Sequence, residues 1–358
     1  MKIYQIRSKC KFKSKNKNSK NLNDKNKINC KFINGKVRNM ELPILLKEKL
    51  EQEIDGIELK KLKQSAQNIS EKYRDKSPSK MSTRLITSRE DAIAYAVSRM
   101  PATYGAVYSA LEHSLEMMPN KEIKSVLDVG AGTGTATWAV NELLNIERNI
   151  CVENEDYMLN LGKKLMQAEI PNVQWIKKNI ITDNIEQKAD LVISSYVLNE
   201  IKAESRNQIL EKLWNSTGKL LLIIEPGTPE GYNQIKEIRD YFIKQGANIV
   251  APCAHEKECK ISKDDWCAFS CRVARTKVHK MLKEGDAPYE DEKFSYIAVS
   301  KMKTDKQDRI LRHPKIENGR ITLKLCTTEG DIEEKTITKK EKEKFKIVKK
   351  LSNGDILK

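Results

Sequence analysis

Hydrophobic positions recur along the chain with two different periods. Between residues 40 and 120, apolar residues repeat every three or four positions, as in Leu46, Leu50, Ile54 and Ile57. This is the spacing of amphipathic helices. The first part of the chain is therefore expected to be a helical unit of about four helices.

Local signals mark boundaries inside this helical unit. The polar stretch DKSPSKMSTR, residues 75–84, predicts a loop. Thr87 or Ser88 is a candidate N-cap for the following helix. Pro101 is expected to end or kink that helix, because proline has no N–H to donate.

After residue 121 the pattern changes to short β-rich runs separated by helical stretches. The seven runs cover residues 125–130, 149–153, 173–179, 189–198, 219–227, 247–252 and 293–301. Strands that alternate with helices predict a parallel, doubly wound α/β sheet. This sheet domain is expected over residues 121–301, with a cysteine-rich insertion at 251–292 between the last two strands. Residues 302–358 alternate like a small, basic β unit.

The net charge of +16 is distributed unevenly. Residues 1–39 hold 13 Lys and Arg and one acid, a net +12, which leaves +4 for the other 319 residues. This Lys/Asn-rich segment is expected to be a disordered tail. It is either a nucleic-acid arm or a dispensable extension, with Met40 as the effective start.

Cysteine usage and hydropathy bear on the location of the protein. No run of about 18 apolar residues and no secretory signal are found, so no membrane span is expected. The eight cysteines then indicate metal binding or catalysis rather than a disulfide framework. We expect a cytoplasmic, monomeric protein.

A glycine-rich loop, DVGAGTGTATWAV (128–140), leaves the first predicted strand and enters a helix. Its glycines let the backbone turn tightly and approach a ligand closely. Asp128 before the glycines suits the cationic amino-acid end of S-adenosylmethionine better than a pyrophosphate. The stretch resembles motif I of class I methyltransferases. The cofactor-binding candidates are Asp128, Gly130, Gly132, Gly134, Glu153 and Asn179.

In this scheme Asp128 would face the methionine amino group, usually through water, and Glu153 would accept hydrogen bonds from the ribose diol. The end of the fourth predicted strand, SSYVLNE (194–200), lacks the Asn/Asp-Pro-Pro-aromatic pattern of amino-group methyltransferases. Pro252-Cys253 follows the wrong strand to act as a nucleophile. The sequence therefore predicts cofactor binding and leaves the catalytic residues unknown.

Four cysteines lie within 19 residues of the insertion: Cys253, Cys259, Cys267 and Cys271. Their spacing is neither the C-x-x-C of zinc knuckles nor the tight motif of radical enzymes. Four thiolates suit either zinc or an iron–sulfur cluster. The fourth ligand is either Cys271 or the distant Cys326, and His255 and His279 are further candidates. Buried free cysteines are the alternative, whereas Cys151, inside a predicted strand, is expected in the core.

Basic residues follow these cysteines. Arg272, Arg275, His279 and Lys283 fall at helical spacing, which places them on roughly one face. With aromatic side chains interleaved, this face is a candidate contact for a phosphate backbone, although a solvated surface is the usual reading. The proposed RNA-binding residues are Arg272, Arg275, Lys277, Lys280 and Lys283.

Several segments together resemble the Rsm-type family of small ribosomal subunit assembly factors. The matching stretches are MELPILL, MPATYGAVYSAL, LDVGAGTGTATWA, EPGTPEG, PCAH, DWCAFS, YEDEKFSYIAVSK and LKLCTTEGDIEEKTIT, spread from Met40 to the end. The resemblance implies a class I methyltransferase fold, an iron–sulfur cluster in the insertion, and binding to the small ribosomal subunit and its rRNA.

The resemblance also implies the ligands of a 4Fe–4S cluster, which are Cys253, Cys259, Cys267 and Cys326. Cys271 then is not a ligand. The chain departs from the family where Cys-Pro-His reads Cys-Ala-His, where Lys260 replaces a proline, and where a C-terminal Trp-Gly-Asp starts with Asn353. The expected function is binding of small-subunit rRNA during subunit assembly; an active S-adenosylmethionine-dependent rRNA methyltransferase is the alternative.

Overall fold

The computed structural model describes residues 32–33, 36–37, 40–74, 85–119 and 122–357. The predicted disordered tail (1–39) lies outside these residues except for β1 (Phe32–Ile33) and β2 (Lys36–Val37), which pair antiparallel. The predicted loop at 75–84 also lies outside them.

The central sheet has eight strands, and its main path runs β5-β4-β3-β6-β7-β10-β8. These strands are β3 (Ser125–Val129), β4 (Arg148–Glu153), β5 (Val173–Lys177), β6 (Ala189–Ser195), β7 (Thr217–Pro226), β8 (Asn248–Ala251) and β10 (Tyr289–Ser300). The strands from β5 to β7 are parallel, and β10 is antiparallel to both of its neighbours. The expected class I methyltransferase-like α/β fold is thus confirmed, with a mixed sheet.

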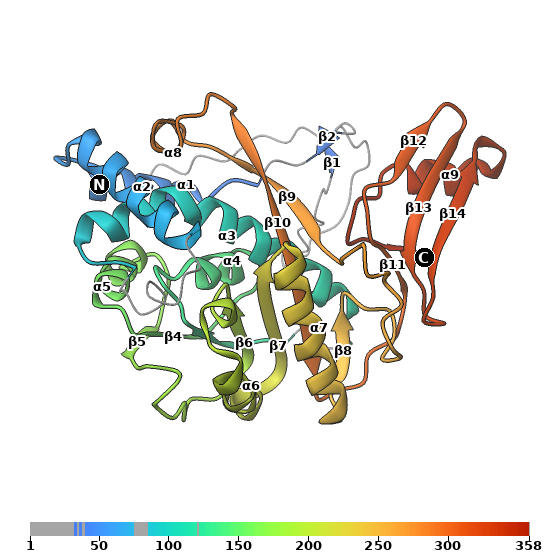
Figure 1. Cartoon of the computed structure of the whole chain (residues 1–358), viewed down its shortest axis with the longest axis horizontal. Helices are drawn as coiled ribbons and strands as arrows, with labels where there is room; N and C mark the ends of the chain where they lie inside the picture. The colour runs from blue at the N-terminus through green and yellow to red at the C-terminus, as the bar shows by residue number, and fades with distance from the viewer. Residues whose placement is uncertain (1–31, 34–35, 38–39, 75–84, 120–121, 358) are drawn as a thin grey trace, which may run out of the picture.

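Both faces of the sheet are covered by helices, as expected from the largely apolar central strands β6 and β7. One face packs against α3 (Arg89–Met117), α4 (Thr135–Leu143) and α5 (Asp156–Met166). The other packs against α6 (Ala203–Ser216) and α7 (Pro229–Lys244), which lie in front of the sheet in Figure 1. In β7, Leu220 and Leu222 belong to the first core and Leu221 and Ile223 to the second, so alternate side chains serve the two faces.

The N-terminal unit contains α1 (Ile44–Ile54) and α2 (Leu59–Arg74), followed by α3. Ser88 caps α3 by accepting a hydrogen bond from the backbone of Asp91, as predicted. The prediction that Pro101 ends or kinks a helix there is corrected, because α3 continues through it for 29 residues. Burial explains this: 23 of those residues are buried, which outweighs the roughly 3 kcal/mol cost of an internal proline.

The chain leaves the sheet after β8 and returns as β10. In between it forms the cysteine-rich segment, then β9 (Phe269–Ala274) and α8 (Lys277–Leu282). β9 pairs with the first half of β10, and this hairpin crosses α3 in Figure 1. Met40 joins the hairpin through backbone hydrogen bonds to Arg272 and Ala274.

The C-terminal segment forms a second sheet, at the right of Figure 1. Its strands are β11 (Asp308–Ile310), β12 (Lys315–Glu317), β13 (Arg320–Cys326), β14 (Ile332–Thr338) and β15 (Ile356–Leu357). α9 (Lys342–Val348) packs on it, and the short turns η1 (Leu198–Glu200) and η2 (Lys339–Glu341) complete the described elements. Among the residues described, no helix is long and apolar enough to cross a membrane.

Candidate functional site

A cavity of about 350 Å³ opens at the carboxyl ends of β3, β4 and β6. This is the point where the strand order reverses, which is the usual ligand site of an open α/β sheet. Four of the six predicted cofactor residues line it: Gly130, Gly132, Glu153 and Asn179.

The glycine loop has the conformation that the sequence predicted. Gly130, Gly132 and Gly134 all have positive φ angles of 71°, 57° and 80°. A Cβ on Gly130 would lie 2.5 Å from Val197 Cγ2, and one on Gly134 would lie 2.0 Å from Met166 Cε. Gly134 therefore faces the packed side of the loop, away from the cavity, and its role is to let the chain enter α4.

Glu153 ties the glycine loop to the end of β4. Its carboxylate accepts hydrogen bonds from the backbone N–H groups of Gly132 (2.7 Å), Asn154 (2.7 Å) and Glu155 (2.8 Å). Burial raises the pKa of this carboxyl, while the three hydrogen bonds oppose the rise. The side chain is thus fixed at the cavity wall, where the acceptor for a ribose diol was predicted.

Asp128 does not line the cavity. Its side chain is fully buried, and Oδ2 accepts hydrogen bonds from the backbone N–H (3.1 Å) and the hydroxyl (2.9 Å) of Thr137 in α4. Burial raises its pKa to about 7. In the structure this carboxyl joins β3 to the first turns of α4, instead of facing a cofactor directly.

The cysteines gather at a second, small cavity. Cys253, Cys259, Cys267 and Cys326 all line one space of about 30 Å³. Cys271 does not line it; its Sγ lies against Gly105 of α3, on the buried side of β9. The four thiols that line this cavity are therefore the four that the family resemblance implies. The other lone cysteine, Cys151, is fully buried in β4, as expected.

The thiols at this cavity do not form a metal-binding arrangement in the described structure. Within the described part of the chain, no three His, Cys, Asp or Glu side chains are placed to hold a metal ion, and the cysteines are free thiols. Burial raises the pKa of Cys253 and Cys267, and that of Cys326 to about 12.

Cationic groups nevertheless surround these thiols. The guanidinium groups of Arg239 and Arg309 partly oppose the rise that burial causes in the pKa of Cys253. Arg239 also donates to the backbone carbonyl of His255 (3.2 Å), and the hydroxyl of Tyr232 lies 3.5 Å from Cys259 Sγ. Arg239 and Tyr232 were not predicted from the sequence, because they lie on α7, outside the cysteine-rich segment.

Polar contacts join the insertion to the C-terminal sheet beside this cavity. Arg309 is fully buried and donates to the carbonyl oxygens of Pro252 (3.1 Å) and Gly354 (2.7 Å). Lys260 forms an ion pair with Asp331 (2.6 Å). Cys326, at the end of β13, thus reaches the other three cysteines from a separate sheet.

The proposed basic face is not a helical face. Arg272 belongs to strand β9, and Arg275 follows it, whereas Lys277 and Lys280 lie on α8. His279 is fully buried. The expectation of one helical stripe is therefore wrong, because 269–274 alternates with period two and packs its apolar residues on α3.

Acidic residues of β10 neutralise part of this basic group. Arg272 makes a two-pronged ion pair with Asp291 (2.7 and 2.9 Å), while Arg275 and Lys283 both pair with Glu290 (2.8 Å each). By contrast, Lys277 is exposed. These contacts fix three of the five proposed RNA-binding residues in the fold.

Two further residues at the sheet edge were missed from the sequence. Tyr196, at the end of β6, has a φ of 60°, and its hydroxyl donates to Glu292 (2.9 Å). Glu225 is fully buried at the end of β7; it accepts a hydrogen bond from the N–H of Leu198 (2.9 Å), and burial raises its pKa to about 8. Glu225 thus holds η1 beside the cofactor cavity. In the sequence, only the motif EPGTPEG, which begins with Glu225, drew attention to this residue.

Comparisons with known proteins point in one direction. The profile of the family described as mitochondrial small ribosomal subunit Rsm22 matches residues 89–358. The human "Ribosome assembly protein METTL17, mitochondrial" is 23% identical over 74% of the chain and 62% of its own length. The "Rsm22-cox11 tandem protein 2, mitochondrial" of Schizosaccharomyces pombe is 22% identical over 77% of the chain and 44% of its own length. The chain therefore spans about half to two thirds of these relatives.

Among solved structures, the chain is similar to the magnesium protoporphyrin IX methyltransferase of Synechocystis with bound S-adenosylhomocysteine. The identity is 12%, the TM-score is 0.38, and the match covers 65% of this chain and 94% of that one. The curated relatives correct one expectation. Both are named as mitochondrial proteins, so the predicted cytoplasmic location is wrong and the family points to mitochondria.

Asp128→Asn tests the buried carboxyl. Because its pKa of about 7 exceeds the ordinary 3.8, the folded protein holds a proton between these values that the unfolded chain has released. This group should therefore lower stability as the pH rises from about 4 to about 7. Asparagine keeps an oxygen for Thr137 and cannot ionise, so we expect the variant to be more stable at about pH 8, by at most roughly 4 kcal/mol.

Urea unfolding of parent and variant across this pH range measures the difference. Subtracting one curve from the other removes the contributions of Glu153 and Glu225, which also have raised pKa values. Thr137→Val, which removes only the hydroxyl donor, is the matched control. A difference between parent and Asp128→Asn that stays constant with pH would contradict the assignment.

Proposed function

The chain belongs to the Rsm22 family of mitochondrial small ribosomal subunit proteins, and on this basis we propose that it is a methyltransferase-like factor that assists assembly of a small ribosomal subunit. In this proposal the sheet domain binds S-adenosylmethionine, the cysteines hold a 4Fe–4S cluster, and basic side chains contact small-subunit rRNA. The observation that carries the proposal is the convergence of four cysteines at one cavity, three from the insertion and one from β13 of the C-terminal sheet.

The donor set fits an iron–sulfur cluster. Four sulfur ligands without a carboxylate are the usual ligands of Fe–S clusters and of structural zinc. A cluster with four thiolates is anionic, and the guanidinium groups of Arg239 and Arg309 supply the opposite charge. When bound, the cluster would supply a structural crosslink. Cys253, Cys259 and Cys267 would hold it from the insertion and Cys326 from β13, so metal binding would stabilise the fold.

Cys326→Ser and Cys271→Ser form a matched pair of variants. Protein purified anaerobically should contain about four irons with sulfide per chain and show the broad visible absorbance of a cluster. Cys326→Ser should lose most of the iron, because one ligand is removed. Cys271→Ser should keep it, because that thiol lies outside the cavity. Zinc without sulfide in the parent, or iron loss in Cys271→Ser alone, would refute the ligand assignment.

The cavity at the glycine loop is the proposed S-adenosylmethionine site. Gly130 and Gly132 leave its floor free of side chains, and Glu153 stands at the end of β4, where a ribose would lie. Asn179 completes the wall at the end of β5. These residues bind and orient a cofactor; they supply no acid or base for transfer.

Equilibrium dialysis with labelled S-adenosylmethionine tests this site. Gly132→Arg should reduce binding at least tenfold, because the long side chain would enter the cavity from a backbone with φ of 57°. Gly246→Arg, at a second positive-φ glycine with open space around it, controls for backbone strain. Equal binding by parent and Gly132→Arg would exclude the site. Methyl transfer to small-subunit rRNA that Gly132→Arg abolishes would instead favour the alternative, an active methyltransferase.

Contacts to rRNA are proposed to come from the α8 region. Arg272, Arg275 and Lys283 are held by Asp291 and Glu290, whereas Lys277 and Lys280 form no ion pair within the described residues. Phosphate contacts release counterions, so binding should weaken with salt. The two α8 lysines should account for more of this salt dependence than the paired residues.

Filter binding to small-subunit rRNA at several salt concentrations checks this expectation. The double variant Lys277→Ala/Lys280→Ala should flatten the slope of log K against log salt by roughly 1.5, the contribution of two phosphate contacts. Lys188→Ala/Lys244→Ala, which removes the same charge from exposed positions elsewhere, should leave the slope unchanged. Equal slopes for both double variants would remove α8 from the interface.

A further inference from the structure

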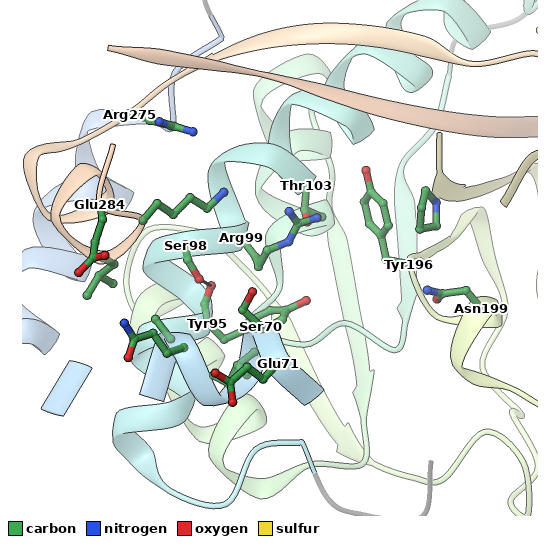
Figure 2. A pocket seen from close by; sticks show the side chains of 16 residues that line it. Ser70, Glu71, Tyr95, Ser98, Arg99, Thr103, Tyr196, Asn199, Arg275 and Glu284 are labelled. Atoms are coloured by element: carbon green, nitrogen blue, oxygen red, sulfur yellow. Dashed lines mark hydrogen bonds between the residues drawn. The ribbon is translucent and has the colours of Figure 1, made fainter. Parts of the chain in front are cut away.

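A cavity of about 730 Å³ lies beside the cofactor cavity and has no role in the function proposed above. Figure 2 shows Tyr196 and Asn199 on one side of it, and Tyr95, Ser70 and Glu71 on the other. The first side is formed by the carboxyl ends of β6 and β7 together with η1. The other comes from α2 and α3, and α8 with the residues after it closes the cavity further round.

The two cavities share part of their walls. Tyr95 and Tyr196 line both the 730 Å³ space and the 350 Å³ space at the glycine loop. A ligand in the larger cavity would therefore lie directly next to a cofactor bound at Gly130 and Glu153. Because it adjoins the cofactor cavity, the larger cavity is a candidate binding site for a reaction partner or another recognised group.

The walls combine three kinds of chemistry. Tyr95 and Tyr196 offer aromatic rings; Asn199 offers an amide with donors and an acceptor. Three cationic side chains, Arg99, Arg275 and Lys283, also line the cavity, beside the two carboxylates Glu71 and Glu284. Arg99 pairs with Glu292, and Arg275 and Lys283 pair with Glu290, so a phosphate would join these ion pairs and not meet free cations. Aromatic faces, a side-chain amide and guanidinium groups are the set that binds an unstacked nucleobase and its phosphate.

Tyr196, which lines both cavities, is held in an unfavourable backbone conformation. Tyr196 has a φ of 60°, which is uncommon for a bulky residue and persists only where surrounding contacts impose it. Its N–H donates to Ile224 of β7 (2.8 Å), and its hydroxyl donates to Glu292 of β10 (2.9 Å). Arg99 of α3 pairs with the same Glu292 oxygen (3.3 Å). Three elements thus fix the ring between the two cavities.

We propose that this cavity accepts the base of one RNA nucleotide, taken out of its stack, with the base against Tyr196 and Asn199 and the phosphate toward the cationic side chains. The inference rests on the proposed function, because it specifies which part of an rRNA the protein grips. The volume is within the range of 300–1,000 Å³ that is typical of small-ligand sites and exceeds what one amino-acid side chain requires.

Titration of the full chain with the four nucleoside 5′-monophosphates tests the proposal. Excess S-adenosylhomocysteine is present throughout, so that the cofactor cavity is blocked. At least one nucleotide should bind, and ribose 5-phosphate and inorganic phosphate should bind at least tenfold more weakly. Thr103→Trp, which fills the cavity from α3, should weaken nucleotide binding at least tenfold. Gln245→Trp, on the exposed end of α7, should not change it.

Asn199→Ala provides a second variant in case Thr103→Trp does not fold, since Asn199 is exposed on η1. It should weaken the preferred nucleotide and leave ribose 5-phosphate unaffected. Equal binding of nucleotide and phosphate would show an anion site only, and would overturn the proposal. So would the absence of nucleotide binding, or binding that neither variant changes.

The same preparations separate this inference from the function on which it rests. Binding of S-adenosylmethionine and of small-subunit rRNA is measured on the parent protein alone. If the parent protein binds nucleotides but neither S-adenosylmethionine nor rRNA, the proposed function is rejected and the nucleotide site is retained. If it binds S-adenosylmethionine and rRNA but no nucleotide, the nucleotide site is rejected and the proposed function is retained.

Discussion

Strand β10 is the element on which the arrangement of all three sites depends. It must return antiparallel between β7 and β8, so the chain has to leave the sheet after β8, and the cysteine-rich segment occupies that excursion. Along β10, Glu290 pairs with Arg275 and Lys283, Glu292 holds Tyr196, and Ser295 donates to the carbonyl of Cys267 (2.8 Å). One strand therefore contacts the basic segment, the nucleotide cavity and the cysteines.

Contacts around the cysteine cavity attach the C-terminal sheet to the insertion. Small sheets of this size have little core of their own, and here six fully buried residues make up that core. The buried Arg309 and the ion pair of Lys260 with Asp331 attach it to the insertion. A cluster that joins Cys326 to the other three cysteines would add a covalent link across the same boundary.

The sequence predicted the parts that depend on local patterns. Apolar runs located seven strands, and Ser88 was a recognisable cap. It could not reveal that Asp128 turns into the core, because its contact with Thr137 depends on how α4 packs. The mistaken helical face had an available signal: Phe269, Cys271 and Val273 alternate with polar residues, which is the period of a strand. Tyr196 and Glu225 contact β10 and η1, and no local motif encodes these contacts.

In the proposed function, one metal cluster joins the insertion to the C-terminal sheet. Amide hydrogen exchange of the anaerobic full chain, before and after removal of iron by a chelator, tests it most directly. We expect residues 252–268 and β13 to lose protection together, while β3, β4 and β6 keep theirs. Unchanged protection in β13 after the iron has been removed would contradict it.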